Sequence, residues 1–250
     1  MATSYSLVTT CAKRWHFLER SLPSWLALPA RGNIFIVTYA FDTTIPVQGL
    51  EHVYLIVIKS EQRFHRTRAL NLGALVARKV DDPQYLMFTD ADIIVRYGDV
   101  FLSNVASGST PDYVLDSRYA LGARRQGLPL EHDPEQRMRG IRGTHLVRSE
   151  LFFRINGFNQ HLQGWGFDDF ELYTRYRQQS TKVSFYDRNS LFHQPHDDAQ
   201  RGELQSSAIK ASMQRNQEQA RRHSDPLGSS WAHQLGYPEY EIRPPTVTKA

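Results

Sequence analysis

The sequence of 250 residues contains little of what is typical of secreted or membrane-spanning proteins. Cys11 is its single cysteine, which excludes a disulfide framework and a cysteine-based zinc site. Its apolar runs, of which His52–Ile58 is typical, are far shorter than the roughly 20 residues that span a bilayer. Residues 1–6 do not combine a basic segment with an apolar one, so we expect neither a secretory signal nor a membrane anchor. These absences predict a cytoplasmic protein.

The sequence also lacks a strong charge of either sign. Lys and Arg number 30 against 26 Asp and Glu, the net charge is +4, and no basic run reaches five residues. This mild excess suits an anionic ligand such as a nucleotide phosphate, and it disfavours nucleic-acid binding through a dedicated basic arm. With 40% hydrophobic and 12% aromatic residues, the chain has enough apolar material for a core, which excludes disorder of the whole chain.

Strand-like and helix-like segments alternate through the first half of the chain. Short apolar runs predict strands, and apolar residues at helical spacing predict the helices between them. The expected strands are Tyr5–Thr10, Asn33–Tyr39, His52–Lys59 and Tyr85–Thr89, and the expected helices are Lys13–Leu28, broken at Pro23, and Thr67–Val80. This alternation favours a parallel, doubly wound α/β sheet, in which ligands bind beyond the carboxyl ends of the strands.

The second half of the chain is less regular. The sequence predicts strands at Tyr113–Asp116, Lys182–Tyr186 and Leu191–His196, and helices at Leu146–Ile155, Asp168–Gln178 and Glu203–Arg222. Between them, Gly122–Gly143 holds five Arg and four Gly but few large apolar side chains. We interpret that segment as a functional loop, a candidate lid over a bound ligand.

Two carboxylates directly follow an expected strand. Asp90 and Asp92 are separated by one residue at the end of Tyr85–Thr89, so both can reach a ligand beyond the sheet. Hard oxygen ligands suit Mg²⁺ or Mn²⁺, which usually take substrate phosphates as further ligands. A solvated turn after a strand would contain the same residues, so this pair alone does not distinguish the two interpretations.

A second acidic pair begins an expected helix. In Gly164–Glu171, two glycines flank Trp165, and Asp168 and Asp169 follow at the helix start. The positive end of the helix favours ionised carboxylates, and a carboxylate beside an acceptor hydroxyl can act as a general base. The structural alternative is helix capping combined with core packing of the tryptophan, which the two glycines make less favourable.

Basic and imidazole groups complete the candidate set. His193 and His196 lie within five residues of one another with Asp197, and neutral imidazole is a good ligand for Mn²⁺. Arg66 and Arg68 stand at the start of an expected helix, where they could bind a diphosphate or a nucleotide ribose. Each group taken by itself is also compatible with an ordinary surface turn.

Taken in order, these residues resemble the GT-A glycosyltransferases of the β-1,4-galactosyltransferase and chondroitin-polymerase type. The matching segments are Thr9–Arg14, His65-Arg66, Asn71–Gly73, Phe88–Asp92, Arg154–Phe158, Gly164–Asp169 and His193. The resemblance covers about residues 5–200, and Ile155–Glu171 is its most specific part. It implies a single GT-A (Rossmann-like) α/β domain over residues 1–200, with a helix in 201–225 packed on it and an extended or disordered tail in 226–250.

The resemblance implies an inverting transfer of a hexose or N-acetylhexosamine, with Mn²⁺ or Mg²⁺, from a nucleotide sugar such as a UDP-sugar. The acceptor would be a glycan, a peptide, a lipid-linked sugar or a small molecule. Asp169 would be the general base, and Asp168 would hold a hydroxyl. The implied acceptor residues are Trp165 and Gly166, and the metal ligands are Asp92, Asp90 and either His193 or His196. The implied donor residues are Thr9, Thr10, Arg14, Asp42, Arg66, Asp90, Gly143 and Thr144.

The chain departs from the family in two respects. Phe167 stands where a glycine is usual, which predicts a reshaped sugar pocket. The absence of an anchor and of disulfides makes the chain similar to a soluble bacterial-type member.

Two other functions have the same fold class. A nucleotidyltransferase would normally have a glycine-rich phosphate loop after the first strand, and Thr9–Arg14 contains no glycine. A non-catalytic nucleotide- or carbohydrate-binding module would require a decayed motif, whereas every motif position is filled.

Overall fold

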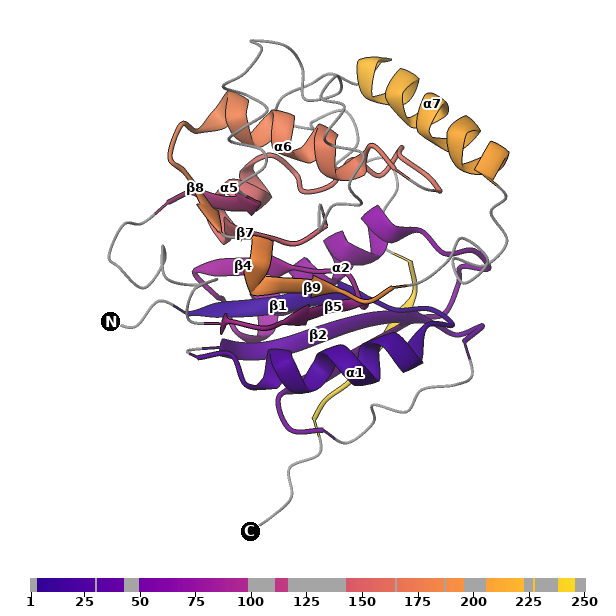
Figure 1. The fold of residues 1–250 in the computed structure, drawn as a ribbon. Helices are drawn as coiled ribbons and strands as arrows, with labels where there is room; N and C mark the ends of the chain where they lie inside the picture. The colour runs from indigo at the N-terminus through magenta and orange to yellow at the C-terminus, as the bar shows by residue number, and fades with distance from the viewer. Residues whose placement is uncertain are drawn as a thin grey trace.

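The structure is a computed structural model that describes residues 4–29, 31–42, 50–98, 111–116, 143–164, 166–186, 188–195, 206–222, 227 and 238–245. Within these residues the chain forms an eight-stranded sheet and a separate two-stranded sheet, with helices packed against both faces of the larger one (Figure 1). The predictions made for Trp165, for His196 and for all but the last residue of Gly122–Gly143 lie outside the described residues.

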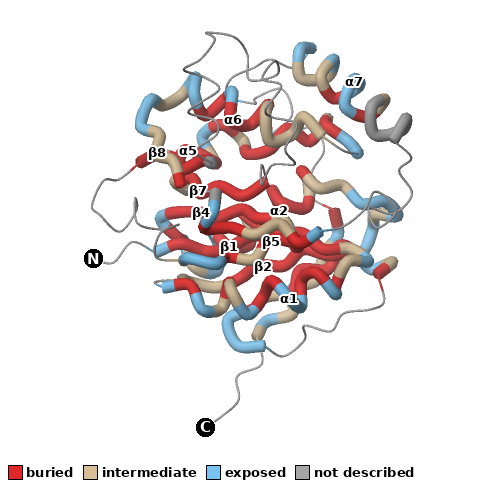
Figure 2. Tube along the Cα trace, in the orientation of Figure 1, coloured by how far each residue is buried: buried red, intermediate tan, exposed pale blue. Residues whose placement is uncertain are grey.

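The parallel part of the large sheet follows the predicted pattern. Strands β1 (Tyr5–Thr10), β2 (Arg31–Tyr39), β3 (Val53–Ile58) and β4 (Tyr85–Phe88) pair in the order β3-β2-β1-β4, all parallel. Nearly every residue of these strands is buried, as expected for a sheet that is covered on both faces (Figure 2). Their carboxyl ends therefore meet along one edge, where Asp90 and Asp92 follow β4.

Two helices cover opposite faces of this parallel part. Helix α1 (Trp15–Leu26) packs against one apolar cluster of the sheet, and helix α2 (Arg66–Val80) packs against the other. Gly73 allows α2 to lie close to the sheet, because a Cβ there would stand 2.5 Å from Val8 Cγ1 and 2.9 Å from Val37 Cγ2. The first residue of α2, Arg66, is thereby placed beside the carboxyl edge of the sheet.

The other part of the sheet is mixed. Strand β7 (His145–Arg148) is antiparallel to β4, β6 (Tyr113–Asp116) is antiparallel to β7, and β8 (Val183–Tyr186) is parallel to β6. Helices α5 (Ser149–Arg154) and α6 (Asp168–Gln179) contribute side chains to the same apolar cluster as α2.

Five further elements complete the described fold. Strands β5 (Ile93–Val95) and β9 (Leu191–His193) form the small antiparallel sheet, with the 3-10 turn η3 (Arg188–Ser190) leading into β9. Helix α7 (Ser206–Arg222) follows, and β10 (Tyr240–Arg243) is antiparallel to β3. No helix in the described part of the chain is long and apolar enough to span a membrane.

Three sequence-based expectations need correction. The helix predicted at Leu146–Ile155 is wrong in its first part, because His145–Arg148 pairs with β4 and β6 and the helix begins at Ser149. Helix α1 is not broken at Pro23 but continues through it, since its buried face packs on the sheet. Within the predicted tail, Tyr240–Arg243 forms a strand of the large sheet instead of a free extension.

Candidate active site

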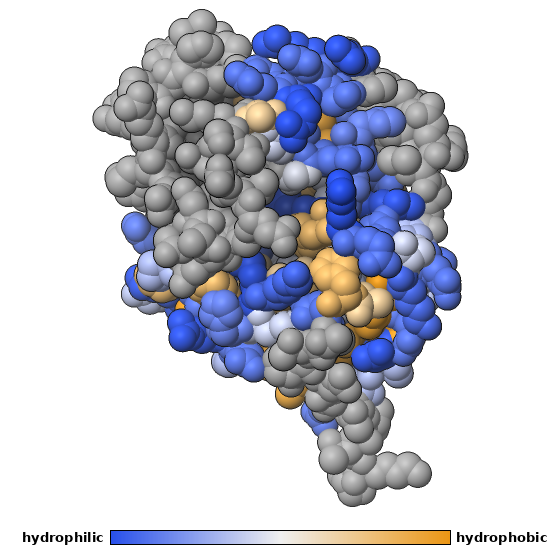
Figure 3. Space-filling model, turned by 90° about the vertical axis from the view of Figure 1, so that its right-hand side faces the viewer, coloured by the Kyte–Doolittle hydropathy of each residue, from blue (hydrophilic) through white to orange (hydrophobic). Residues whose placement is uncertain are grey.

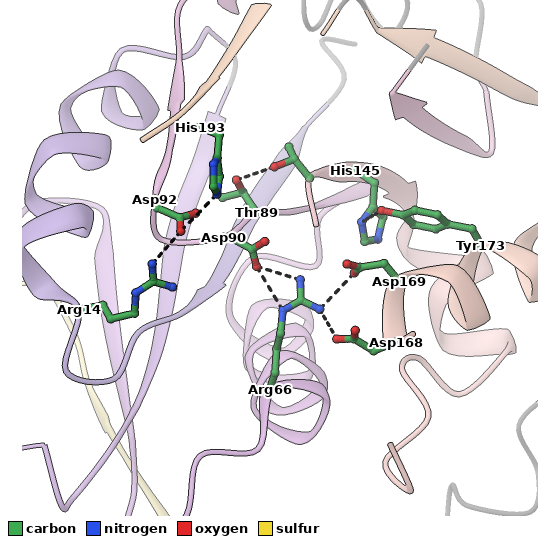
Figure 4. A network of polar contacts seen from close by, with 11 residues as sticks. Arg14, Arg66, Thr89, Asp90, Asp92, His145, Asp168, Asp169, Tyr173 and His193 are labelled. Atoms are coloured by element: carbon green, nitrogen blue, oxygen red, sulfur yellow. Dashed lines mark hydrogen bonds and ion pairs between the residues drawn. The ribbon is translucent and has the colours of Figure 1, made fainter. Parts of the chain in front are cut away.

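The acidic and basic residues singled out in the sequence converge from four elements. Asp90 and Asp92 follow β4, Arg66 begins α2, Asp168 and Asp169 begin α6, and His193 ends β9. Figure 4 shows their side chains grouped around two guanidinium groups. The structure therefore brings together residues that are up to 179 positions apart in the sequence, from Arg14 to His193.

Arg66 joins the two acidic motifs. Its Nε and Nη2 donate hydrogen bonds to Asp90 Oδ1 at 3.2 and 2.9 Å. Its Nη1 donates to Asp168 Oδ2 at 2.5 Å and to Asp169 Oδ1 at 3.1 Å. Burial alone would lower the pKa of Arg66, but the carboxylates hold that pKa well above its ordinary value. One guanidinium thus fixes the spacing between the carboxylate after β4 and the pair at the start of α6.

Burial favours a proton on Asp169. Burial raises the pKa of Asp169 to about 7, and the neighbouring Asp168 and Asp90 act in the same direction, while Arg66 opposes them. A carboxylate that gains and loses its proton near neutral pH is suited to general acid–base chemistry.

Asp92 belongs to a second cluster. Its Oδ2 lies 3.0 Å from Arg14 Nη2 and 3.6 Å from His193 Nε2, and the residue is 3% exposed. Gln194 holds this end of β9 in place, because its backbone N–H donates to Asp92 O at 2.9 Å. The Gln194 side chain also donates to Phe17 O at 2.9 Å in α1. Asp90 and Asp92 therefore serve different clusters.

Asp92 and His193 could supply two ligands to a metal ion, but not a complete set of ligands. Among the described residues no set of three or more His, Cys, Asp or Glu side chains gathers as a metal cluster. Asp92 and His193 do lie together, whereas Asp90 is held by Arg66. A carboxylate oxygen with an imidazole nitrogen is a suitable donor pair for Mn²⁺, which would take phosphate oxygens and water as its other ligands.

Gly143 and Thr144 lie directly beside the first cluster. A Cβ on Gly143 would overlap the Asp90 carboxylate and stand 2.8 Å from Arg66 Nη2, so a larger residue here would have to displace these two side chains. The hydroxyls of Thr144 and Thr89 lie 2.9 Å apart, and Thr144 O accepts a hydrogen bond from Tyr186 at 2.8 Å. The structure thus brings both residues beside the acidic groups, and their role in donor binding stays a prediction.

The remaining predicted donor residues sit in the scaffold. Asp42 Oδ2 accepts hydrogen bonds from Lys13 N at 2.6 Å and from the Trp15 indole at 2.8 Å, which ties the end of β2 to the start of α1. Thr9 is fully buried, and its hydroxyl makes no hydrogen bond to the described residues. Thr10 ends β1 and is 9% exposed. We therefore assign Asp42 a structural contact at the edge of the site.

The sequence analysis did not identify His145, which lies behind Asp169 (Figure 4). Its Nδ1 is 3.1 Å from Tyr173 Oη and its Nε2 is 3.3 Å from Tyr176 Oη, both on α6. Burial, and then the charge of Arg66, lowers the pKa of His145 to about 3, so the ring is neutral. No local signal indicated this role, because the contacts arise only when β7 pairs in the sheet.

Helix α6 is anchored by contacts that explain the Asn-Gly-Phe motif. Asn71 on α2 donates to Phe158 O and accepts from Phe158 N, both at 2.8 Å. Arg175 on α6 donates to Gly157 O at 2.6 Å, and its Nε lies 2.7 Å from Glu171 Oε1. The turn at Gly157 therefore links α2 to α6 and holds the first turn of α6 opposite Arg66.

The approach to α6 has an unusual backbone. Gly164 and Gly166 have φ angles of +77° and +87°, and Phe167 also has a positive φ of +75°. For a residue with a side chain this left-handed conformation costs roughly 1–2 kcal/mol. The sequence resemblance implies a glycine at this position, and the backbone found here explains that preference.

Comparisons with known proteins relate this site to one group of enzymes. A family model described as "N-terminal domain of galactosyltransferase" matches residues 131–197. β-1,4-Galactosyltransferase 4 of Cricetulus griseus is 26% identical over 161 residues, which cover 63% of this chain and 43% of that protein. The chain thus spans less than half the length of this curated relative. The galactosyltransferase part of the resemblance agrees with these matches, while the chondroitin-polymerase and bacterial-type parts stay predictions.

Solved structures give the same relation at the level of the fold. The catalytic domain of Drosophila β-1,4-galactosyltransferase 7 in complex with xylobiose superposes with a TM-score of 0.57 at 19% identity, covering 94% of this chain and 83% of that one. A variant of that enzyme with manganese, UDP-Gal and xylobiose gives a TM-score of 0.54 at 18% identity, covering 84% and 79%. The predicted fold class is confirmed: this chain has the GT-A fold, with a mostly parallel central sheet flanked by helices.

Proposed function

We propose that this chain is a metal-dependent, inverting glycosyltransferase. It moves a hexose or N-acetylhexosamine from a nucleotide sugar, a UDP-sugar in the first instance, to an acceptor hydroxyl. The observation that supports this most is the contact of Arg66 with both Asp90 and the Asp168–Asp169 pair. That contact places the candidate base close to the carboxylate that follows β4, at the edge of the sheet where a donor would bind. The complex of a structural neighbour with manganese and UDP-Gal supports the same class of donor.

The donor diphosphate would lie between the two clusters. Asp92 and His193 would hold the divalent metal, which when bound supplies positive charge to the leaving diphosphate. Arg14, 28% exposed beside Asp92, and Arg66 supply further positive charge to the same phosphates. Water is a competing acceptor, and Gly122–Gly143 is proposed to exclude it as a lid.

Asp169 is the proposed base. It takes the proton of the acceptor hydroxyl while the acceptor oxygen bonds to the anomeric carbon from the face opposite the diphosphate. The bond between the anomeric carbon and the phosphate oxygen breaks, and the nucleoside diphosphate leaves with that electron pair. A single displacement of this kind inverts the anomeric configuration. Asp168 holds a sugar hydroxyl, and Trp165 with Gly166 contacts the acceptor.

A donor panel tests this function. With Mn²⁺ and no added acceptor, we expect slow release of the nucleotide (a nucleoside diphosphate from UDP-, GDP- and dTDP-sugars, CMP from CMP-sugars) from one member of this donor set. EDTA and the Asp92→Ala substitution should each abolish the release. Nucleotide binding without any release would favour a binding module instead. Release of pyrophosphate from a nucleoside triphosphate in the presence of a sugar phosphate would favour a nucleotidyltransferase.

The pH dependence of the same reaction reports on Asp169. Because the base must be ionised and burial raises the pKa of Asp169 to about 7, kcat/KM should rise with pH through this region and level off above it. Asp168→Asn removes a neighbouring negative charge and should move the rise to lower pH. A profile that is flat between pH 5 and 8 in the wild-type enzyme would argue against Asp169 as the base.

A further inference from the structure

Helix α7 packs on the loop that leads into α6, although it lies outside the segment matched by the galactosyltransferase family model. Its described residues are mostly exposed or half-buried, but Ser212 and Asn216 are only 1% and 3% exposed. These two residues are four positions apart and therefore lie on one face of the helix. Figure 3 views the molecule from the side of α7, and its upper part is mainly hydrophilic. The Asn216 side chain is thus buried on a helix whose other described side chains are mostly in contact with solvent.

Both polar atoms of the Asn216 side chain form hydrogen bonds with that loop. Its Oδ1 accepts a hydrogen bond from Gln163 N at 3.1 Å, and its Nδ2 donates to Gly166 O at 2.7 Å. Ser212 Oγ donates to Gln163 O at 3.2 Å. Asn216 thus bonds to the backbone before and after residues 164 and 165. Ser212 adds a second bond to the backbone of Gln163.

The two glycines of the loop allow this close packing. A Cβ on Gly164 would lie 2.5 Å from Ser212 Oγ, and a Cβ on Gly166 would lie 2.8 Å from Met213 Cγ. Both glycines have positive φ angles. Because glycine adopts positive and negative φ about equally well, the glycines themselves do not favour this conformation over others. External hydrogen bonds are therefore needed to define its conformation, and α7 provides three of them.

The loop ends where the proposed chemistry begins. Gly166 precedes Phe167, whose φ is also positive, and Asp168 and Asp169 follow as the first residues of α6. Helix α7 and this loop also line a pocket, whose residues are His161, Gln163, Arg215, Asn216 and Gln219. The loop and the helix thus form one surface together, and the same loop leads into the acidic pair.

We infer that Asn216, with support from Ser212, is a positioning residue that holds the backbone of Gln163 and of Gly166 in the arrangement that binds the acceptor sugar. This inference rests on the proposed function, because it concerns the acceptor side of the same site. Asn216 does not touch the donor residues or the candidate base. Its loss should therefore weaken acceptor binding and leave the reaction of the donor with water unchanged.

Asn216→Ala tests this role, with Gln214→Ala at an exposed position of the same helix as the control. Losing two hydrogen bonds to the loop should raise the KM for the acceptor by about tenfold, measured with xylobiose and a panel of aryl glycosides. Release of nucleotide from the donor without acceptor should stay within about twofold of wild type, as should every parameter of the control. Asn216→Asp keeps the acceptor for Gln163 N–H but loses the donor to Gly166 O. Its KM for the acceptor should therefore also lie above the wild-type value.

Hydrogen exchange supplies a readout that does not depend on activity. The Gln163 amide proton should exchange about tenfold faster in Asn216→Ala than in wild type or the control. If Asn216→Ala does not fold, Ser212→Ala, which loses the bond to Gln163 O, should show the same changes to a smaller degree. An active wild type combined with unchanged acceptor KM and unchanged Gln163 protection in Asn216→Ala overturns the inference. A wild type that releases no nucleotide from any donor overturns the proposed function itself.

Discussion

Asp169→Asn is expected to lower the rate of sugar transfer by about a thousandfold, within the range typical of general-base catalysis. The amide is nearly isosteric and can still accept the hydrogen bond from Arg66 Nη1, which spans 3.1 Å in the native site. It cannot take a proton from an acceptor hydroxyl. The measurement is the initial rate of nucleoside diphosphate release at saturating donor, with and without acceptor.

Stability measurements separate this loss from misfolding. Burial and the neighbouring carboxylates already disfavour the ionised form of Asp169, so a neutral amide removes an unfavourable charge from the folded state. We expect the free energy of unfolding at pH 8 to be unchanged or higher in Asp169→Asn. Binding of UDP with Mn²⁺ should also be retained. A variant that transfers sugar at more than a tenth of the wild-type rate would exclude Asp169 as the base.

Arg66→Met should produce the largest loss of stability among the site variants. It removes the guanidinium that, in the described part of the chain, contacts all three of Asp90, Asp168 and Asp169, and it leaves these acidic groups to repel one another. Breaking a buried ion pair on one side typically costs about 3–5 kcal/mol, and we expect about 3 because the Asp90 side chain is 42% exposed. Urea denaturation monitored by circular dichroism gives the free energy of unfolding, and donor turnover should also be lost.

A double-mutant cycle shows whether the carboxylates cause this loss. Asp169→Asn added to Arg66→Met removes one of the uncompensated charges, so the double variant should be more stable than Arg66→Met alone. Arg68→Met is the matched control, since Arg68 forms its ion pair with Glu61 away from the acidic pairs. Strictly additive effects in the cycle would mean that Arg66 stabilises the fold through packing and not through its charge.

Much of the site could be predicted because its residues stand at the ends of regular elements. The apolar runs of β1 to β4 and the helical spacing in α2 and α6 were clear, and parallel pairing brings the carboxyl ends of strands to one edge. Topology therefore placed Asp90 and Asp92 at the edge where ligands bind, and the family resemblance added Arg66 and the Asp168–Asp169 pair to the same site. The contacts between them, including the division of Asp90 and Asp92 between two clusters, depend on side-chain directions that no sequence pattern specifies.

What could not be predicted arises from long-range pairing. The segment after Thr144 is short and apolar, so its pattern fits a helix as well as a strand, and only the ladder with β4 selects the strand. His145 and Asn216 were missed for the same reason, because their partners lie in other elements. The resemblance implies a donor-binding role for Asp42, which stays a prediction, and its hydrogen bonds from Lys13 and Trp15 were not indicated by the sequence.

The anomeric configuration of the first product tests the central claim most directly. Methanol can serve as a small acceptor, because the methyl glycoside that it forms does not change its configuration in solution. With Mn²⁺ and an α-linked UDP-sugar, proton NMR should show UDP and the β-methyl glycoside, and neither should form in the presence of EDTA. An α-methyl glycoside would contradict the single displacement with Asp169 as base, and the absence of both glycosides with every donor would contradict the assignment of this site to sugar transfer.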